Sequence, residues 1–511
     1  MTQLLVICFY LLLLLGLGAL TQRLFRGTAR DYFLASHSIG PVMLLMSVFG
    51  TTMTAFALVG STGESYRAGI GVYGMMASWS GLVHAAVFFL VGIRLWALGK
   101  RHGYLTQIQF FRDRFESDAV GLMLFPILVG LVIPYLLTGL LGAAGVVQSL
   151  TQGAFPEAFA ATQGGVPPWL TGLVICVVVL TYVFFGGMRG AAWANTFQTC
   201  VFIFAGLVAF YLISSKLGGA AAATQRVMEL HPERLIRGEQ ITHLQFLSYL
   251  FIPLSIGMFP HVFQHWLTAR SAATFKLTIV AHPLFIVLVW VPCVLIGVWA
   301  TSATMPDGSL VVPPGSPPNG ELATMVQRLT SPLLGGLLGA GILAAIMSSL
   351  DSQFLSIGSM FANDIAAHYL GRDRIDDRRR VLLGRVFVVL VVALTYALSL
   401  TEPLAVFTLG VWCFSGFGAL FPLVFAAIYW KGATKAGAMA SILATAASWL
   451  VLFRESGYGA DHAYLFLGML PAATIFACSL VALVAVSLVT EAPAQSKLQR
   501  FFPELSGAGG E

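Results

Sequence analysis

Charged residues are scarce in this sequence: Asp, Glu, Lys and Arg make up 10% of its 511 residues, whereas hydrophobic residues make up 58%. Soluble globular domains carry about 25% charged residues. The shortage excludes a large soluble domain and predicts an all-α protein that crosses the membrane many times. The net charge of +6 is interpreted as a signal of membrane topology, so no nucleic-acid partner is expected.

Disulfide-forming cysteine patterns and enzyme motifs are also lacking. The six cysteines all fall within apolar runs and form no CxxC pair, so we expect packing residues rather than disulfides or metal ligands. The sequence contains no HExxH motif, no GxSxG motif and no paired catalytic carboxylates within an apolar segment. These absences argue against an intramembrane enzyme.

Long apolar runs fill most of the chain. A helical span needs about 20 apolar residues, and about 13 segments of this sequence meet that need. The first segment lacks the basic flank and the small-residue cleavage site of a signal peptide, so we interpret it as a retained span. The predicted spans lie near residues 3–22, 39–61, 70–98, 118–148, 169–186, 192–214, 244–264, 277–303, 332–366, 381–401, 404–429, 434–454 and 465–489.

Lys and Arg are unevenly distributed among the loops between these spans. With the N-terminus outside, about three-quarters of the 28 basic residues fall in or beside the inner loops, as the positive-inside rule requires. We therefore predict an odd number of spans, with the N-terminus outside and the C-terminus inside. A basic cluster at 372–380 could also bind anionic lipid, although a role in topology is the simpler account.

Two of the spans are interrupted near their middle. Residues 50–54 (GTTMT) interrupt the second span, and Pro253, Gly257 and Pro260 interrupt the seventh. Each interruption alone could be a simple kink, or it could free backbone carbonyls and amides for a ligand. The two breaks begin two successive sets of five spans. An odd repeat length inverts the second set, and matched broken helices in inverted repeats predict a central binding site.

These repeats predict the organisation of the whole chain. Because only a short tail follows the last span, we expect no kinase or dimerisation domain there, although a separate partner protein stays possible. The predicted units are an extra N-terminal span (1–30), a first five-helix repeat (31–215), an external loop (216–243), an inverted second repeat (244–430), two C-terminal helices (431–490) and a short cytoplasmic tail (491–511).

Small residues, mostly serines, form a stripe within the ninth span. They recur at three- and four-residue steps, so they share one helix face. Asp351 lies beside them, and a buried carboxylate in a membrane needs a cation or a donor network. Hard cations such as Na+ prefer oxygen ligands, although serines also bond to their own helix or pack against a neighbour. The stripe comprises Ala345, Ser348, Ser349, Ser352, Ser356 and Ser359.

Five short motifs follow one another along the chain, and each is modest alone. They are DYFL with SIGP (31–41), KRHGYLTQIQFFRDR (100–114), GGMRGAAW through to a glutamine (186–198), AAIMSSLDS (344–352), and FGALFPLVFAAIYW followed by GA (417–438). Through these motifs, residues 30–440 resemble the sodium:solute symporter family, which includes transporters of proline, pantothenate, sugars and sialic acid. The resemblance implies a leucine-transporter-type fold with Na+ as the coupling ion.

The resemblance also implies a sodium site between the family's first and eighth core helices. Carried over by motif, its ligands here are the carbonyl oxygens of Gly50, Met53 and Ala345 and the hydroxyls of Ser348 and Ser349. Such a site has only oxygen ligands and no formal charge. We therefore expect weak, readily released Na+ binding.

Two positions depart from the family pattern. Thr52 stands where many relatives have an aspartate in the first core helix, and Asn195 stands where many have one in the fifth. Asn195, Asp351 and Ser352 together are candidates for a second ion site. Asp351 could equally be protonated, or could be hydrogen-bonded to Asn195 for a structural reason.

The resemblance places the solute beside the two breaks. The polar lining of sugar transporters is missing at Ala57, Met76 and Trp79, and the aromatic pair of proline transporters is replaced by Ile252 and Ile256. Helix N-termini and threonines could hold a carboxylate, which favours a small carboxylate or amino-acid-like solute. The candidate solute residues are Thr51, Thr52, Thr54, Met75, Trp79, Tyr135, Thr138, Ile256, Phe259, Trp412 and Ser415.

His84, His261 and His265 lie within or just beyond predicted spans. His84 is a candidate for proton coupling, but a lone membrane histidine is more often a structural hydrogen-bonding group. His261 and His265 have the i, i+4 spacing of metal ligands. We place them at the cytoplasmic end of their helix without carboxylate neighbours, so we expect no metal site there.

We therefore predict a Na+-coupled secondary transporter that imports a small organic solute by alternating access. Its expected location is the cell membrane (inner or plasma membrane), with the bilayer and the solute as partners and a monomer as the working unit. Two alternatives stay open: H+ coupling through Asp351 or His84, and a membrane receptor or sensor that transports nothing. Uptake that persists without Na+ but stops when pH gradients are dissipated would favour H+ coupling.

Overall fold

The computed structural model describes residues 1–22, 32–33, 39–238, 240–314, 316, 319–371, 375–401 and 405–502. About 80% of the structure is helical, and these residues form no strand. The all-helical class predicted from the sequence is therefore confirmed. Some predicted features lie outside the described residues, namely part of the basic cluster at 372–380, part of the motif at 31–41 and the tail beyond residue 502.

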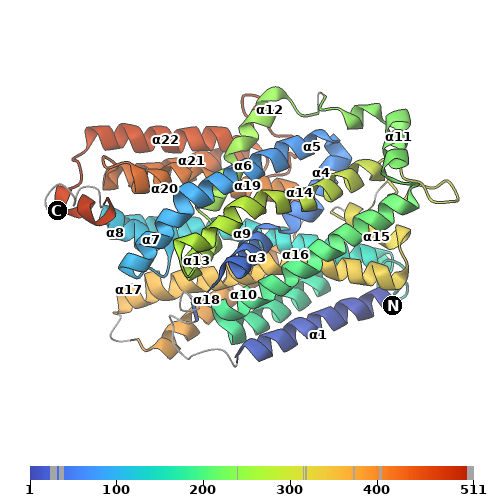
Figure 1. Cartoon of the computed structure of the whole chain (residues 1–511), viewed down its shortest axis with the longest axis horizontal. Coiled ribbons are helices and arrows are strands. Elements are labelled where there is room, and N and C mark those ends of the chain that lie inside the picture. Colours follow the sequence, from blue (N-terminus) through green and yellow to red (C-terminus); the bar gives the residue numbers. More distant parts are fainter. Residues whose placement is uncertain are drawn as a thin grey trace.

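Long helices form the bundle. They are α1 (Thr2–Gln22), α9 (Asp118–Leu150), α10 (Pro168–Lys216), α14 (Phe275–Ala300), α16 (Pro332–Met360), α18 (Asp377–Ser399), α19 (Val406–Ala419), α21 (Lys435–Glu455) and α22 (Pro471–Val489). They run roughly parallel, with α1 along one edge of the bundle and α21 and α22 along the opposite edge (Figure 1).

Shorter helical segments complete and connect the bundle. They are α3 (Pro41–Thr52), η2 (Phe56–Gly60), α4 (Ser61–Ala68), α5 (Gly71–Tyr73), η3 (Gly74–Ser78), α6 (Trp79–Val87), η4 (Phe88–Gly92), α7 (Ile93–His102), α8 (Gln107–Phe115), η5 (Ala160–Thr162), α11 (Ala220–Leu230), η6 (Pro232–Leu235), α12 (His243–Ser248), η7 (Tyr249–Phe251), η8 (Pro253–Gly257), α13 (Pro260–Thr268), η9 (Ala272–Thr274), α15 (Glu321–Leu329), η10 (Phe361–Ala366), α17 (Ala367–Leu370), α20 (Phe421–Tyr429) and α23 (Gln495–Phe501). The segments from α5 to α7 follow one another without a gap and make one apolar span (Gly71–His102).

The helices establish a protein that crosses the membrane several times. Within the described residues, 10 helices are long and apolar enough to cross, or up to 12 if each of two bent pairs is one span. α10 has 49 residues and would extend about 74 Å at about 1.5 Å per residue, far beyond a bilayer core of about 30 Å. Gly187 interrupts it with φ 54° and ψ −158°, between the predicted spans 169–186 and 192–214. The total of 13 spans stays a prediction.

Gly187 is expected to tolerate no side chain. Its backbone conformation is one that essentially only glycine adopts, and a Cβ there would lie 2.8 Å from Tyr32 Cδ2 and 2.9 Å from the Tyr32 carbonyl oxygen. We expect Gly187→Val to destabilise the bundle by about 1–3 kcal/mol, measured as a lower melting temperature of the purified protein. Gly206→Ala is the matched control, because a Cβ at Gly206 meets nothing within 4 Å. A Gly187→Val protein that melts like the wild type contradicts this account.

The structure confirms both predicted helix breaks. The segments Pro41–Thr52 and Phe56–Ala68 are bent by 60°, and the segments His243–Gly257 and Pro260–Thr268 are bent by 52°. The first break falls at Met53, whose φ of −87° and ψ of 87° are not helical. The second is restarted by Pro260, because proline fits the first position of a helix, where no amide donor is needed.

Helix α16 occupies the centre of the bundle. The apolar part of its span is 83% buried inside the protein, close to the 89% of the span Val406–Tyr429 and far above the 28% of α1 and of α18. It packs against α10, α9, α1, α18 and α3. Since a helix that is covered on all sides cannot turn polar groups toward water, its serines and Asp351 must find partners within the protein.

The C-terminal helix α23 lies against α8. Arg500 Nη2 is 3.1 Å from Asp113 Oδ2, and the Phe501 ring lies 5.7 Å from the His102 ring. Arg114 of α8 in turn donates from Nε to the Ala427 carbonyl oxygen of α20 at 2.9 Å. Burial lowers the pKa of Arg114 to about 10, which leaves its guanidinium charged at neutral pH. Part of the predicted cytoplasmic tail is thus packed on the bundle.

Candidate ion and solute site

The break in α3 meets the hydroxyl stripe of α16. Ser348 Oγ lies 2.8 Å from the Gly50 carbonyl oxygen and 2.9 Å from the Ala345 carbonyl oxygen. The structure therefore brings together three of the five residues that the resemblance assigned to a sodium site. Ser349 Oγ instead donates to the Ile346 carbonyl oxygen of its own helix at 2.8 Å, and Met53 is buried at the break.

Gly50 lets α3 approach α10 closely at this point. A Cβ on Gly50 would lie 2.3 Å from Thr199 Oγ1 and 3.3 Å from the Asn195 carbonyl oxygen. Thr199 Oγ1 donates across the same contact to the Met46 carbonyl oxygen at 3.0 Å. Because Gly50 has no side chain, α3 can lie close to α10 while the Gly50 carbonyl oxygen faces Ser348 on α16.

This group of oxygen atoms suits a hard monovalent cation. Its hydroxyl and carbonyl oxygens carry no formal charge, and such ligands are those that hard cations prefer. The described residues hold no group of three or more His, Cys, Asp or Glu that could bind a transition metal. The oxygen atoms are therefore of the kind that could hold Na+, and Ser348 would then exchange its hydrogen bond to Gly50 for a contact with the ion.

A second polar cluster surrounds Asp351, which is fully buried. Tyr182 donates its hydroxyl to Asp351 Oδ2 at 3.2 Å, and Ser352 Oγ donates to Asp351 Oδ1 at 3.0 Å. The Asn195 amide, oriented so that both its ends are satisfied, donates to Asp351 Oδ2 at 3.0 Å and has its oxygen 2.9 Å from Ser352 Oγ. All three predicted residues of the second ion site are therefore in contact. The groups that donate to Asp351 are neutral, so a proton or a cation is still needed to balance the charge of its buried carboxylate.

His265 lies beside this second cluster. As the sequence analysis predicted, it stands in the last turn of its helix α13, and its side-chain partner among the described residues is a hydroxyl rather than a carboxylate. In the structure its Nε2 lies 3.1 Å from Ser352 Oγ, one hydroxyl away from Asp351. The spacing of histidines within α13 carries no information about which residues of α16 face that helix, so the sequence offered no signal for this contact.

His84 is not the lone histidine that the sequence analysis assumed. Its ring lies 5.2 Å from the ring of His282 on α14. His282 Nε2 in turn lies 3.3 Å from Thr52 Oγ1, beside the break in α3. The sequence analysis missed His282, because two residues so far apart in the chain leave no pattern that reveals their contact.

Some of the candidate solute residues gather between the two breaks. The Tyr135 ring lies 5.3 Å from the Phe259 ring and 4.9 Å from the Phe414 ring. Thr51 is fully buried, and its hydroxyl has no hydrogen-bond partner among the described residues. Ile256 is also fully buried. Phe414 was not among the sequence candidates, although it lies between the candidates Trp412 and Ser415 in the chain.

Other candidates are engaged elsewhere. Trp79 Nε1 donates to the Phe246 carbonyl oxygen at 3.0 Å. Trp412 makes edge-to-face ring contacts with Trp449 and Phe453 and lines a separate cavity of about 140 Å³, which Glu64 also lines. The remaining hydroxyl groups mostly serve their own segments. Thr54 accepts from the Phe56 amide at 3.1 Å, Thr138 donates to the Tyr135 carbonyl oxygen and Ser415 to the Val411 carbonyl oxygen, both at 2.6 Å, and Met75 is buried.

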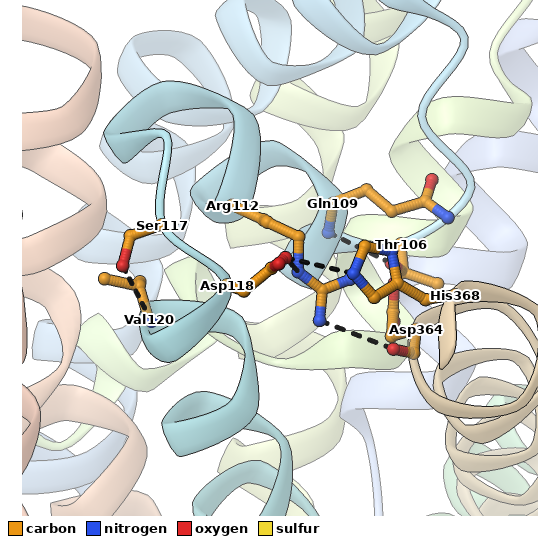
Figure 2. Close-up of polar contacts among 8 residues, drawn as sticks. All are labelled: Thr106, Gln109, Arg112, Ser117, Asp118, Val120, Asp364 and His368. Atoms are coloured by element: carbon orange, nitrogen blue, oxygen red, sulfur yellow. Dashed lines mark hydrogen bonds and ion pairs between the residues drawn. The ribbon is translucent and has the colours of Figure 1, made fainter. Parts of the chain in front are cut away.

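A polar network joins α8 and α9 to the segment that continues α16 (Figure 2). Thr106 Oγ1 donates to Asp364 Oδ1 at 2.9 Å. Arg112 Nε lies 3.2 Å from Asp118 Oδ1, and His368 Nε2 lies 3.0 Å from the same oxygen. Arg112 also donates from Nη2 to the Asp364 carbonyl oxygen at 3.4 Å. Movement of η10 and α17 relative to α8 must therefore break these contacts.

Burial decides which contact of this network matters most. Asp364 is fully buried, whereas 66% of the Asp118 side chain is exposed. We expect Thr106→Val to cost about 1–3 kcal/mol, because it leaves a buried carboxylate short of a donor. We expect Asp118→Asn to cost less than about 1 kcal/mol, since water screens an exposed ion pair. Melting temperatures of the two purified variants test this order, and a larger loss for Asp118→Asn would contradict it.

The sequence of this chain is similar to one protein family and to several known proteins. The family model described as the sodium:solute symporter family matches residues 32–445. A high-affinity proline transporter of Bacillus subtilis (strain 168) is 26% identical over 484 residues, which cover 92% of this chain and 95% of that protein. A sodium/proline symporter of Staphylococcus aureus is 28% identical over 459 residues, which cover 87% of this chain and 84% of that protein.

Solved structures share the fold. A Na+-coupled sialic acid symporter in a substrate-bound outward-open state matches with a TM-score of 0.77 at 17% identity, covering 97% of this chain and 99% of that one. A nucleobase-cation-symport-1 family transporter, closed around bromovinylhydantoin, matches with a TM-score of 0.54 at 13% identity, covering 92% and 97%. These neighbours have the leucine-transporter-type fold. The likeness confirms that part of the predicted fold.

Proposed function

Because the chain belongs to the sodium:solute symporter family, we propose that it imports a small organic solute together with Na+ by alternating access. Na+ is the coupling ion of this family. We propose that the chain crosses the cell membrane 13 times as a monomer, with the N-terminus outside and two inverted repeats at 31–215 and 244–430. The solute class that we favour is a small carboxylate or amino-acid-like molecule.

One observation carries this proposal: Ser348 Oγ lies 2.8 Å from the carbonyl oxygen that the α3 break frees at Gly50. An ion held by Gly50, Met53, Ala345, Ser348 and Ser349 would pin α3 against α16. The solute residues beside the same break would then be fixed in their binding arrangement. Coupling follows if the closed state is favoured only when ion and solute are both bound.

The direct test is the thermal stability of the purified protein in NaCl, compared with KCl and choline chloride at the same ionic strength. A ligand that binds only the folded state raises the melting temperature by mass action. We expect a rise that is specific to Na+ and that saturates with Na+ concentration. Equal melting curves in all three salts up to molar concentrations would contradict Na+ binding by this chain.

A second candidate function keeps the transporter fold but couples solute to H+. The observation that favours it is the Asp351 cluster, where the donors to the buried carboxylate within the described residues are the neutral groups of Tyr182, Asn195 and Ser352. A proton on Asp351 would satisfy this cluster as well as a second Na+ would. Solute uptake into proteoliposomes, driven by a pH gradient in choline chloride and absent with a Na+ gradient alone, would support this alternative.

A further inference from the structure

The imidazole of His261 is fully buried and makes no hydrogen bond through either ring nitrogen to any described residue. A neutral imidazole offers one donor and one acceptor, and leaving both unmet in a protein interior costs free energy. His265, one turn later on α13, differs because its Nε2 reaches Ser352 Oγ at 3.1 Å. The unmet groups of His261 therefore point to a ligand rather than to a structural role.

His261 lies among the candidate solute residues. Its ring is stacked on the Phe259 ring with 5.1 Å between centroids and lies 5.5 Å from the Tyr135 ring. Phe414 packs against both of these neighbours, at 5.5 Å from Phe259 and 4.9 Å from Tyr135. Two aromatic rings, Phe259 and Tyr135, thus contact the imidazole, at the position where the family resemblance placed the solute.

The position of His261 in its helix favours an acceptor or anion. It is the second residue of α13, which begins at Pro260 just after the second break, and Phe259 provides no side-chain cap for the first turn. The free amides at a helix N-terminus carry partial positive charge and favour a carboxylate. The His261 ring supplies an N–H donor beside that helix end. Together these donors fit one carboxylate group.

The surrounding rings favour a solute that itself carries a ring. Tyr135, Phe259 and Phe414 contact one another in this structure, so a solute must separate them. A flat ring restores the offset or edge-to-face contacts that are lost, whereas a short acyclic chain does not. The site therefore discriminates by shape as well as by charge.

We propose that His261 is a specificity-determining residue that donates a hydrogen bond to the carboxylate of a solute whose aromatic ring packs against Tyr135, Phe259 and Phe414. This assignment rests on the proposed function, since it concerns the solute of that same transporter. It narrows the solute class from small carboxylates in general to carboxylates that carry an aromatic ring.

The test measures melting temperature in NaCl with benzoate, cyclohexanecarboxylate, acetate or proline added, and repeats the series in choline chloride. We expect benzoate to raise the melting temperature most, and only with Na+ present. We expect His261→Phe to need at least about tenfold more benzoate for the same rise in melting temperature. His261→Gln keeps a hydrogen-bond donor, so its affinity for benzoate should fall less. His231→Phe is the control, because the His231 side chain is 43% exposed outside the bundle.

The outcomes separate this inference from the proposed function. A wild-type protein that responds to Na+ but not to benzoate, or that responds more to acetate or proline, contradicts the inference and leaves Na+ coupling intact. An unchanged benzoate response in His261→Phe also contradicts it. A wild-type protein without any Na+ response contradicts the proposed function instead. If His261→Phe fails to fold, the wild-type probe series and His261→Gln still decide.

Discussion

Changing Ser348 and Ser349 together to alanine is expected to abolish the Na+-specific rise in melting temperature. The double variant removes both hydroxyl ligands of the proposed site and leaves only the carbonyl oxygens of Gly50, Met53 and Ala345. At a Na+ concentration of about 100 times the dissociation constant, a single site stabilises the folded protein by about 2.7 kcal/mol. We expect this whole increment to disappear, while melting in choline chloride changes little.

Ser356→Ala is the matched control for the double variant. Ser356 lies on the same stripe, is equally buried, and its Oγ donates to the Gln353 carbonyl oxygen of its own helix at 2.9 Å. The control therefore removes the same kind of local hydrogen bond without touching the α3 break. A Na+ response that survives in Ser348→Ala with Ser349→Ala, or that is lost equally in Ser356→Ala, removes the basis for the site.

The single variants resolve an ambiguity in the geometry. Ser348 already faces the Gly50 carbonyl oxygen, whereas Ser349 bonds to Ile346 within its own helix. A ligand role for Ser349 requires its hydroxyl to turn when the ion binds. We expect both single variants to weaken the Na+ response, and an undiminished response in Ser349→Ala would restrict the site to Ser348 and the carbonyls.

The breaks and the stripe could be predicted from sequence because their causes are local. Pro253, Gly257 and Pro260 disrupt a helix through their own chemistry, and the serine spacing follows helix periodicity. The predicted count of thirteen spans treats α10 as two spans. In the structure the two apolar segments of α10 are both helical, and Gly187 alone interrupts the helix between them. Hydropathy identifies such apolar segments but carries no information on whether a loop or a continuous helix joins them.

The contacts between distant segments could not be predicted in this way. His282 approaches His84 and Thr52, and His265 approaches Ser352, through packing of helices that are far apart in the chain. No spacing rule relates such pairs. The family resemblance did place Asn195 beside Asp351 and Ser352, because it carried information on helix packing that periodicity and composition lack.

Replacing Asp351 with alanine is expected to destabilise the protein by about 3 kcal/mol or more. The change removes the acceptor of Tyr182, Ser352 and Asn195, and each buried donor left without a partner costs about 1–3 kcal/mol. Asp351→Asn keeps the volume and part of the hydrogen bonding, so its loss of stability should be smaller. The pair separates the cost of lost hydrogen bonds from the cost of a lost charge, with melting temperature as the measurement.

The number of bound ions can be read from the same variants. For each Na+ that binds only the folded protein, stability rises by about 1.4 kcal/mol per tenfold increase in Na+ above saturation. If Asp351 holds a second Na+, Asp351→Asn halves this slope, and the exchange Asn195→Asp with Asp351→Asn restores it, since the two side chains are 3.0 Å apart. If Asp351 instead carries a proton, the wild-type slope already corresponds to one ion and Asp351→Asn alters the pH dependence of melting. A variant with an unchanged Na+ slope and an unchanged pH dependence would assign Asp351 a structural role, because a charge that couples to neither ion cannot drive transport.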